Sequence, residues 1–161
     1  MKRDIFIDTN ITSNFANPAD PNYKELIAWL NDNHDIAEGQ EDDRAYLVVS
    51  TKLLEEYCRS FRGSFLTNAM PMIVNRLTID GRLVNISNAE IREFKNAEFV
   101  PRIVRHMQSN AEDREHIPVV LLSERKYALT NDGGFTHDLG LFPRYGATVS
   151  DRPEQIPYKE G

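Results

Sequence analysis

The stretch "RDIFIDTNI", residues 3–11, contains the apolar run Ile5–Ile7, which is followed by the carboxylate of Asp8. It is the part of the sequence that most clearly indicates the fold. The run predicts a short, mostly buried strand over residues 4–8. Asp8 closes this strand, and Asn10 follows two residues later. Asp and Asn favour turns and helix caps because their side chains bond nearby backbone N–H groups. The alternative is that Asp8 holds a metal ion, and the remaining sequence has to decide between the two.

The composition indicates one globular domain. The chain has 161 residues, of which 40% are hydrophobic and 27% charged, and these proportions exclude a disordered protein. We assign residues 1–150 to the domain and residues 151–161 to a polar, loosely held tail. No apolar run approaches the roughly 18 residues that cross a bilayer, and "MKRDIF" is not followed by the apolar segment of a signal peptide. The single cysteine, Cys58, makes no internal disulfide, so we expect a cytoplasmic protein without membrane contact.

The net charge of −6 bears on the class of partner. An acidic protein does not attract phosphate backbones by itself. Either this chain does not bind nucleic acid, or its carboxylates gather around cations that mediate the contact. The second interpretation predicts acidic residues that converge in space from distant parts of the sequence.

Strand-like and helix-like segments alternate along the chain. Apolar runs predict strands at residues 4–8, 45–50, 83–87, 127–132 and 147–151. Helical spacing predicts helices at residues 21–32, 51–61, 66–76, 89–99, 101–108 and 117–124. Because long segments separate the strands, we predict an α/β fold with three α/β/α layers and a central, mostly parallel sheet.

Polar residues, prolines and glycines mark the ends of these segments. Asp20 and Asn88 are the expected caps of the helices that follow them. Pro71 is expected to disturb its helix, and "GG" at 133–134 to form a turn. The acidic stretch 33–44 is expected to be a solvated loop.

Two predicted strands end in acidic residues. Asp8 closes the first strand and Asp132 closes "ALTND", and each has a small polar companion, Asn10 and Thr130 respectively. In open α/β sheets, ligand sites lie beyond the carboxyl ends of the strands. These side chains are therefore candidates for one common site.

Further carboxylates can reach the same edge of a parallel sheet. Glu55 and Glu56 lie about one helical turn beyond the second strand, and Asp113 precedes the apolar helix 117–124. Oxygen-only clusters suit Mg²⁺ or Mn²⁺, and without a cation packed carboxylates raise one another's pKa. A bound metal can activate water and stabilise charge on a phosphate, which reconciles an acidic protein with a polyanionic substrate.

Four blocks of the sequence together resemble the PIN-domain ribonucleases. "IFIDTNI" is similar to the opening strand of that family, with its first metal-site acid and the usual Asn. "VVSTKLLEEY" is similar to the second block, in which a strand-end Ser precedes a helix with an essential Glu, and the commonest spacing of six residues selects Glu56 over Glu55. "DREHIPVVLLSERKYALTND" and "NDGGF" resemble the remaining blocks, with Asp113 and Asp132 19 residues apart and Phe135 at the end.

The resemblance covers residues 4 to about 150 and implies a metal-dependent endoribonuclease that cleaves single-stranded RNA. It implies that metal-activated water attacks the phosphodiester and leaves a 5′-phosphate and a 3′-hydroxyl. The implied catalytic and metal-binding residues are Asp8, Glu56, Asp113 and Asp132, supported through hydrogen bonds by Asn10 and Thr130. Many small members of the family are toxins of bacterial toxin–antitoxin pairs and often dimerise. The resemblance therefore adds a toxin role, an antitoxin partner and a homodimer to the hypotheses.

Pro118 departs from the family pattern. It lies five residues after Asp113, inside what is usually an unbroken helix. Either the helix begins near Ile117 or it kinks. Asp113 can then be displaced, with Glu112 or Glu115 as substitutes.

The remaining candidates are weighed against an ordinary solvated surface. Basic residues that can contact RNA phosphates are Lys52, Arg59, Arg102 and Arg105. The histidines lack the spacing of zinc ligands and are expected at the surface or in caps: His34, His106, His116 and His137. Asp138 can add a fifth carboxylate, but we expect an exposed loop residue.

The first functional hypothesis is thus an Mg²⁺- or Mn²⁺-dependent endoribonuclease. The alternative is a non-catalytic module of the same fold that binds a protein or RNA partner. A phosphohydrolase of another α/β family would need a covalent nucleophile and a downstream Lys in a matching block. No block of this sequence is a convincing match for that pattern.

Overall fold

Five parallel strands form the centre of the fold in the computed structural model, which describes residues 1–16, 19–31, 39–61 and 69–161. The strands are β1 (Arg3–Ile7), β2 (Ala45–Val49), β3 (Leu83–Asn85), β4 (Tyr127–Leu129) and β5 (Thr148–Ser150). They are hydrogen-bonded in the order β3-β2-β1-β4-β5, and every neighbouring pair is parallel. The predicted α/β class with a parallel sheet is confirmed.

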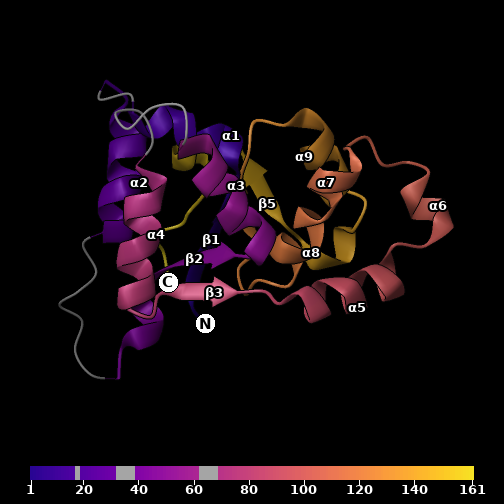
Figure 1. The fold of residues 1–161 in the computed structure, drawn as a ribbon, viewed down its shortest axis with the longest axis horizontal. Coiled ribbons are helices and arrows are strands. Elements are labelled where there is room, and N and C mark those ends of the chain that lie inside the picture. Colours follow the sequence, from indigo (N-terminus) through magenta and orange to yellow (C-terminus); the bar gives the residue numbers. More distant parts are fainter. Residues whose placement is uncertain (17–18, 32–38, 62–68) are drawn as a thin grey trace.

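Helices flank this sheet, as the three-layer prediction requires. The α-helices are α1 (Thr9–Thr12), α2 (Pro21–Asn31), α3 (Thr51–Phe61), α4 (Met70–Ile79), α5 (Asn88–Glu98), α6 (Pro101–Val104), α7 (Ala111–Arg114), α8 (His116–Leu121) and α9 (Gly133–Leu139). Short 3₁₀ turns lie at Ser13–Ala16, Glu41–Asp43, Pro143–Tyr145 and Pro153–Gln155. In Figure 1, α2 and α4 stand together at the left and α5 to α9 gather at the right, with the strands between them. Both α2 and α8 pack on β2.

None of the helices in the described residues has the length and apolar content of a membrane span.

The order of the strands reverses at β1. The strands β2 and β3 extend the sheet on one side of β1, whereas β4 and β5 extend it on the other. In open parallel sheets, such a reversal leaves a crevice beyond the carboxyl ends of the two strands where the order changes, here β1 and β4. The fold therefore directs attention to the residues that follow these two strands.

The strand β1 is enclosed on both faces. Ile5, Phe6 and Ile7 have no exposed surface, as expected for a parallel strand covered by helices on both sides. Asp4 is buried as well, and its carboxylate accepts the backbone N–H groups of Glu124 at 2.8 Å and Arg125 at 2.9 Å. A buried carboxylate thus ties the start of β1 to the turn that leads into β4.

Two helix caps can be compared with prediction. The Asp20 carboxylate accepts the N–H groups of Asn22 at 3.0 Å and Tyr23 at 3.4 Å, as expected for the cap of α2. The prediction of Asn88 as a cap is wrong, because Ser87 caps α5 and Asn88 is its first residue. Ser87 and Glu90 form a reciprocal capping box, which satisfies one N–H group at each position.

Prolines and glycines also act differently from prediction. Pro71 lies in the first turn of α4, where its missing N–H costs no hydrogen bond, so it starts the helix instead of disturbing it. Gly133 and Gly134 open α9 instead of forming a separate turn. The predicted helix residues 66–68 and loop residues 33–38 lie outside the described residues.

The C-terminal residues are packed, in contrast to the loosely held tail that we expected. Ile156 and Tyr158 are buried, and the Tyr158 ring meets Trp29 of α2 edge-on with 4.9 Å between ring centroids. Arg152 forms an ion pair of 2.9 Å with Asp20. The C-terminal segment is therefore tied to α2 and to its cap through Tyr158 and Arg152.

Replacing Asp4 with Ala is expected to destabilise the protein. Two backbone N–H groups would lose their acceptor, at a cost of about 2 kcal/mol or more in the free energy of unfolding. Urea denaturation of wild type, Asp4→Ala and Asp4→Asn measures this loss, and the Asn variant, which keeps an acceptor oxygen, should retain more stability. Equal stability of the Ala variant and the wild type would contradict a tethering role.

Candidate functional site

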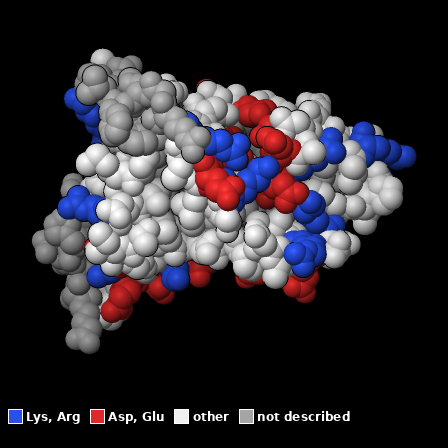
Figure 2. Space-filling model, in the orientation of Figure 1, with Lys and Arg blue, Asp and Glu red and all other residues white. Residues whose placement is uncertain are grey.

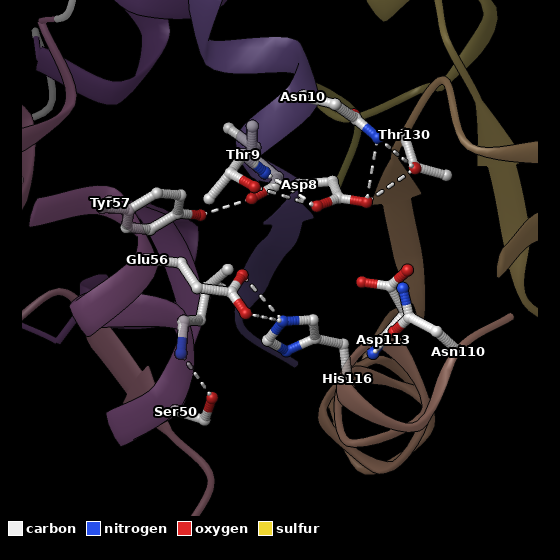
Figure 3. A network of polar contacts seen from close by, with 12 residues as sticks. Asp8, Thr9, Asn10, Ser50, Glu56, Tyr57, Asn110, Asp113, His116 and Thr130 are labelled. Atoms are coloured by element: carbon white, nitrogen blue, oxygen red, sulfur yellow. Dashed lines mark hydrogen bonds and ion pairs between the residues drawn. The ribbon is translucent and has the colours of Figure 1, made fainter. Parts of the chain in front are cut away.

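The register of β1 and β4 brings Asp8 next to Thr130. Ile7 pairs with Leu129, and the N–H of Asp8 continues the ladder by donating to the Leu129 carbonyl at 2.8 Å. The Thr130 hydroxyl then donates to Asp8 Oδ2 at 2.8 Å, and the N–H of Thr9 donates to Oδ1 at 2.8 Å, which caps α1. Asp8 is thus the cap of α1, and its carboxylate also bonds Thr130 at the end of β4 (Figure 3).

Asn10 joins the ends of the same two strands. Its amide nitrogen lies 3.3 Å from Asp8 Oδ2 and 3.4 Å from Thr130 Oγ1, at hydrogen-bond distance from both. Its amide oxygen accepts the N–H of Asn131 at 3.2 Å. The hydrogen-bonding support expected of Asn10 and Thr130 is therefore present.

The helix α3 directs Glu56, and not Glu55, toward the crevice. Ser50 accepts the N–H of Leu53 at 3.1 Å, so the strand-end serine caps the helix. The Glu56 side chain is 19% exposed and faces inward (Figure 3), whereas Glu55 is exposed and lines a separate surface hollow with Arg59. Of the two glutamates left open by the sequence, Glu56 is the one that reaches the site.

Tyr57 fixes α3 against the end of β1. Its hydroxyl donates to the carbonyl of Ile7, immediately before Asp8, and its side chain is 1% exposed. This contact sets the distance between the helix that carries Glu56 and the strand that carries Asp8.

His116 is the residue that sequence reasoning missed. The expectation of a surface or capping histidine is wrong, because the residue is 2% exposed and its Nε2 lies 3.0 Å and 2.9 Å from the two carboxylate oxygens of Glu56. Its position three residues after Asp113, one helical turn away at the head of the apolar run "HIPVVLL", was the available signal. His34 lies outside the described residues, and His106 and His137 are exposed.

Pro118 breaks the helix, as predicted, into α7 and α8. It has no N–H to donate to the carbonyl of Arg114, and its ring would clash with that carbonyl. The interruption falls at Glu115, between the two short helices. The alternative of a helix that begins near Ile117 is therefore confirmed, because α8 begins at His116.

Asp113 nevertheless stays with the other acids. Its backbone N–H donates to the side chain of Asn110 at 2.8 Å, which caps α7. The proposed substitutes do not take its place, because Glu112 is exposed and Glu115 pairs with Lys95. The break thus leaves Asp113 close enough to Asp132 and Asp8 for their charges to act on it, while the neighbouring glutamates are exposed or paired elsewhere.

Asp138 explains how the start of α7 is held. The expectation of an exposed loop residue is wrong, because Asp138 is fully buried in α9. Its carboxylate accepts the N–H groups of Gln108 at 2.8 Å and Ser109 at 2.9 Å, and also the Ser109 hydroxyl. It anchors the segment that ends in Asn110, and through that cap it sets the position of Asp113.

Asp132 caps α9 at the end of the β4 connection. Its Oδ1 accepts the N–H of Phe135 at 3.0 Å, and its own N–H donates to Thr130 Oγ1 at 3.1 Å. Gly134 lies close by, where a Cβ atom would come within 3.3 Å of Asp132 Oδ1 and 3.4 Å of the Gln108 carbonyl carbon. The glycine permits this close approach of α9 to the segment before α7.

The pKa shifts show that these carboxylates interact. Burial raises the pKa of Asp8, while the hydrogen bond from Thr130 lowers it, and the charge of Glu56 adds to the rise. Burial also raises the pKa of Asp113, followed by the charges of Asp132 and Asp8 and then by that of Glu56. Four acids from distant parts of the sequence therefore act on one another electrostatically.

The donor set fits a hydrated hard cation better than a dehydrated one. Carboxylate oxygens are the ligands that Mg²⁺ and Mn²⁺ prefer, and Mg²⁺ usually keeps several of its waters. Within the described residues, no group of three His, Cys, Asp or Glu side chains is arranged to hold a metal ion directly. The carboxylates that would hold such an ion are those of Asp8, Glu56, Asp113 and Asp132.

Basic residues are distributed around this region. Lys52 is half-buried on α3, and the other three candidates are exposed, Arg59 on α3 and Arg102 and Arg105 around α6. Figure 2 shows acidic and basic side chains intermixed over the middle of one face, with further basic ones toward the end occupied by α6. The surface around the acids is therefore mixed in charge, and contact of these residues with RNA stays a prediction.

Replacing Asp132 with Asn is expected to lower the pKa of Asp113, because the charge of Asp132 raises that pKa more than the charge of any other acid does, while Asn keeps the cap of α9. Carbon-detected NMR titration of the Asp113 carboxyl group measures the change. Asp42→Asn, at an exposed ion pair with the N-terminus, is the control and should leave that pKa unchanged. An unaltered Asp113 pKa in the Asp132 variant would show that the acids do not interact.

Comparisons of the chain with protein-family models, curated proteins and solved structures gave no match. The function is therefore inferred from the arrangement of Asp8, Glu56, Asp113 and Asp132.

Proposed function

We propose that the protein is a metal-dependent endoribonuclease that cleaves single-stranded RNA, as its resemblance to PIN-domain ribonucleases implies. The observation that supports this most is that Asp8, Glu56, Asp113 and Asp132 lie near one another at the reversal point of a parallel sheet. There, in addition to burial, the charge of Glu56 raises the pKa of Asp8, and the charges of the other three acids raise that of Asp113. Isolated turn residues or helix caps would not be expected to converge. Acids that repel one another at a ligand-binding position favour a cation as the missing partner.

The residues of the chain have separate tasks in this proposal. Asp8 and Asp132 are held by backbone N–H groups of α1 and α9, so their free lone pairs have fixed directions. Thr130 and Asn10 keep the ends of β1 and β4 together. A bound Mg²⁺ or Mn²⁺ would supply an activated water and would shield the charge of the phosphate.

A non-catalytic binding module is the second candidate. The observation that favours it is that no three potential ligands among the described side chains are arranged around one point. In that case the fold would be kept for binding a protein or RNA partner. The two candidates differ in whether the protein binds Mn²⁺ and cleaves RNA.

Replacing Asp8 with Asn is expected to lower Mn²⁺-dependent cleavage of single-stranded RNA by about 100-fold or more, the usual effect of removing a central electrostatic group. The measurement is the cleavage rate together with the chemistry of the product ends, which should be a 5′-phosphate and a 3′-hydroxyl. Glu56→Gln and Glu55→Gln form a matched pair on α3, of which only the first should lose activity. Full activity of the Asp8 variant would refute the proposal, and a wild type that neither binds Mn²⁺ nor cleaves RNA would favour the binding module.

The Asp8→Asn substitution is also expected to stabilise the metal-free protein at neutral pH. Because burial raises the folded-state pKa of Asp8, its carboxyl group favours folding when protonated, and this contribution is lost as the pH rises through the folded pKa. In EDTA, Asp8→Asn should therefore unfold at higher urea concentration than the wild type at pH 7, and the difference should shrink toward about pH 4, near the unfolded value. A less stable variant at pH 7 would mean that the bonds from Thr9 and Thr130 outweigh the burial of the charge.

A further inference from the structure

The pair of His116 and Glu56 is a buried polar contact that the proposed reaction does not yet use. The Nε2 atom of His116 is within 3.0 Å of both carboxylate oxygens of Glu56, and the two side chains point toward each other in the space below Asp8 (Figure 3). His116 is the first residue of α8, directly after the break caused by Pro118. The break between α7 and α8 therefore places a histidine at the candidate site.

The other ring nitrogen indicates which tautomer the site favours. His116 Nδ1 is buried and has no hydrogen-bond partner among the described residues. A hydrogen on Nδ1 would be a buried donor without an acceptor, which costs more than leaving an acceptor lone pair unused. The tautomer with its hydrogen on Nε2 satisfies the geometry, and Nε2–H then donates to the Glu56 carboxylate.

Packing holds the imidazole ring in this orientation. The Phe6 ring of β1 lies against it, with 5.9 Å between ring centroids and 52° between the planes. The histidine side chain is almost entirely enclosed, so it has little freedom to turn. Because the ring can hardly turn, its hydrogen bond can fix the orientation of the more flexible Glu56 side chain.

Glu56 is held differently from the two acids that cap helices. Asp8 and Asp132 cap helices and are fixed by backbone N–H groups, whereas Glu56 lies in the middle of α3, where the N–H groups already serve the helix. Its longer side chain also loses more rotamer freedom when it is ordered. A donor from α8 offsets this disadvantage.

We propose that His116 is a positioning residue that orients the Glu56 carboxylate toward a bound divalent cation. The inference rests on the proposed metal-dependent function and adds a residue that the four-acid pattern does not contain. Groups that donate to metal-binding carboxylates typically change metal affinity by about 10- to 100-fold when they are removed. His116 acts through Glu56, so its effect should disappear when Glu56 can no longer respond.

A double-mutant cycle in Mn²⁺ binding tests the proposal. Calorimetric titration gives the dissociation constant for wild type, His116→Met, Glu56→Gln and the double variant. His116→Met should weaken binding about tenfold in the wild-type background. It should have no further effect in the Glu56→Gln background, whereas a merely structural role would weaken binding equally in both.

A matched variant separates the donor from the packing. His116→Gln has the length of Met and an amide donor close to the Nε2 position, so it should restore most of the affinity. His106→Leu, at an exposed histidine, is the control and should change nothing. If His116→Met does not fold, His116→Gln and His116→Asn replace it, because only the Gln amide reaches the Nε2 position, and equal affinities of these two would overturn the proposal.

The outcomes distinguish this inference from the proposed function. Equal weakening by His116→Met in both backgrounds overturns the positioning role and leaves metal-dependent function intact. A wild-type protein that binds no Mn²⁺ overturns both. If His116→Met weakens Mn²⁺ binding only when Glu56 is present, and His116→Gln restores the affinity, both the positioning role and the metal-dependent function are supported.

Discussion

The parallel pairing of β1 with β4 is the constraint on which the site depends. Because Ile7 is in register with Leu129, the next residues, Asp8 and Thr130, emerge side by side at the same edge of the sheet. A shift of one residue would turn each side chain to the opposite face, and Asp8 would enter the apolar core. The tether from Asp4 to the turn before β4 fixes the same register from the other end of the strand.

Two anchors outside the sheet place the remaining acids. The Tyr57 hydroxyl holds α3 to the carbonyl of Ile7, and the buried carboxylate of Asp138 holds the segment before α7 to α9. Both anchors are buried hydrogen bonds to backbone groups, so each is costly to remove. The positions of Glu56 and Asp113 are therefore consequences of buried hydrogen bonds and do not depend on an unbroken helix.

Much of this arrangement could be predicted from the sequence, for identifiable reasons. The strands are short apolar runs separated by long segments, and parallel strands meet at their carboxyl ends, so Asp8 and Asp132 could be assigned to one edge. His116 and Asp138 could not be assigned to the interior. A polar residue is predicted to be exposed when only its neighbours in the sequence are considered. Its burial depends on a partner far away in the chain, which is Glu56 for His116 and Ser109 for Asp138. The packed tail escaped prediction for the same reason, since Tyr158 contacts Trp29 of α2, far away in the sequence.

The energetic cost of the site is linked to its proposed use. Burial and mutual repulsion raise the pKa of Asp8 and Asp113, which means that the ionised, metal-free site opposes folding. A cation that binds only the folded state relieves this repulsion and stabilises the protein in proportion to the logarithm of its concentration. The interaction that weakens the empty site is thus the same one that would give it affinity for a cation. In a chain of net charge −6, this cation would also be what allows an anionic nucleic acid to approach. His116 fits this arrangement through its geometry, because its ring nitrogen Nε2 contacts both carboxylate oxygens of Glu56 from a buried and closely packed position.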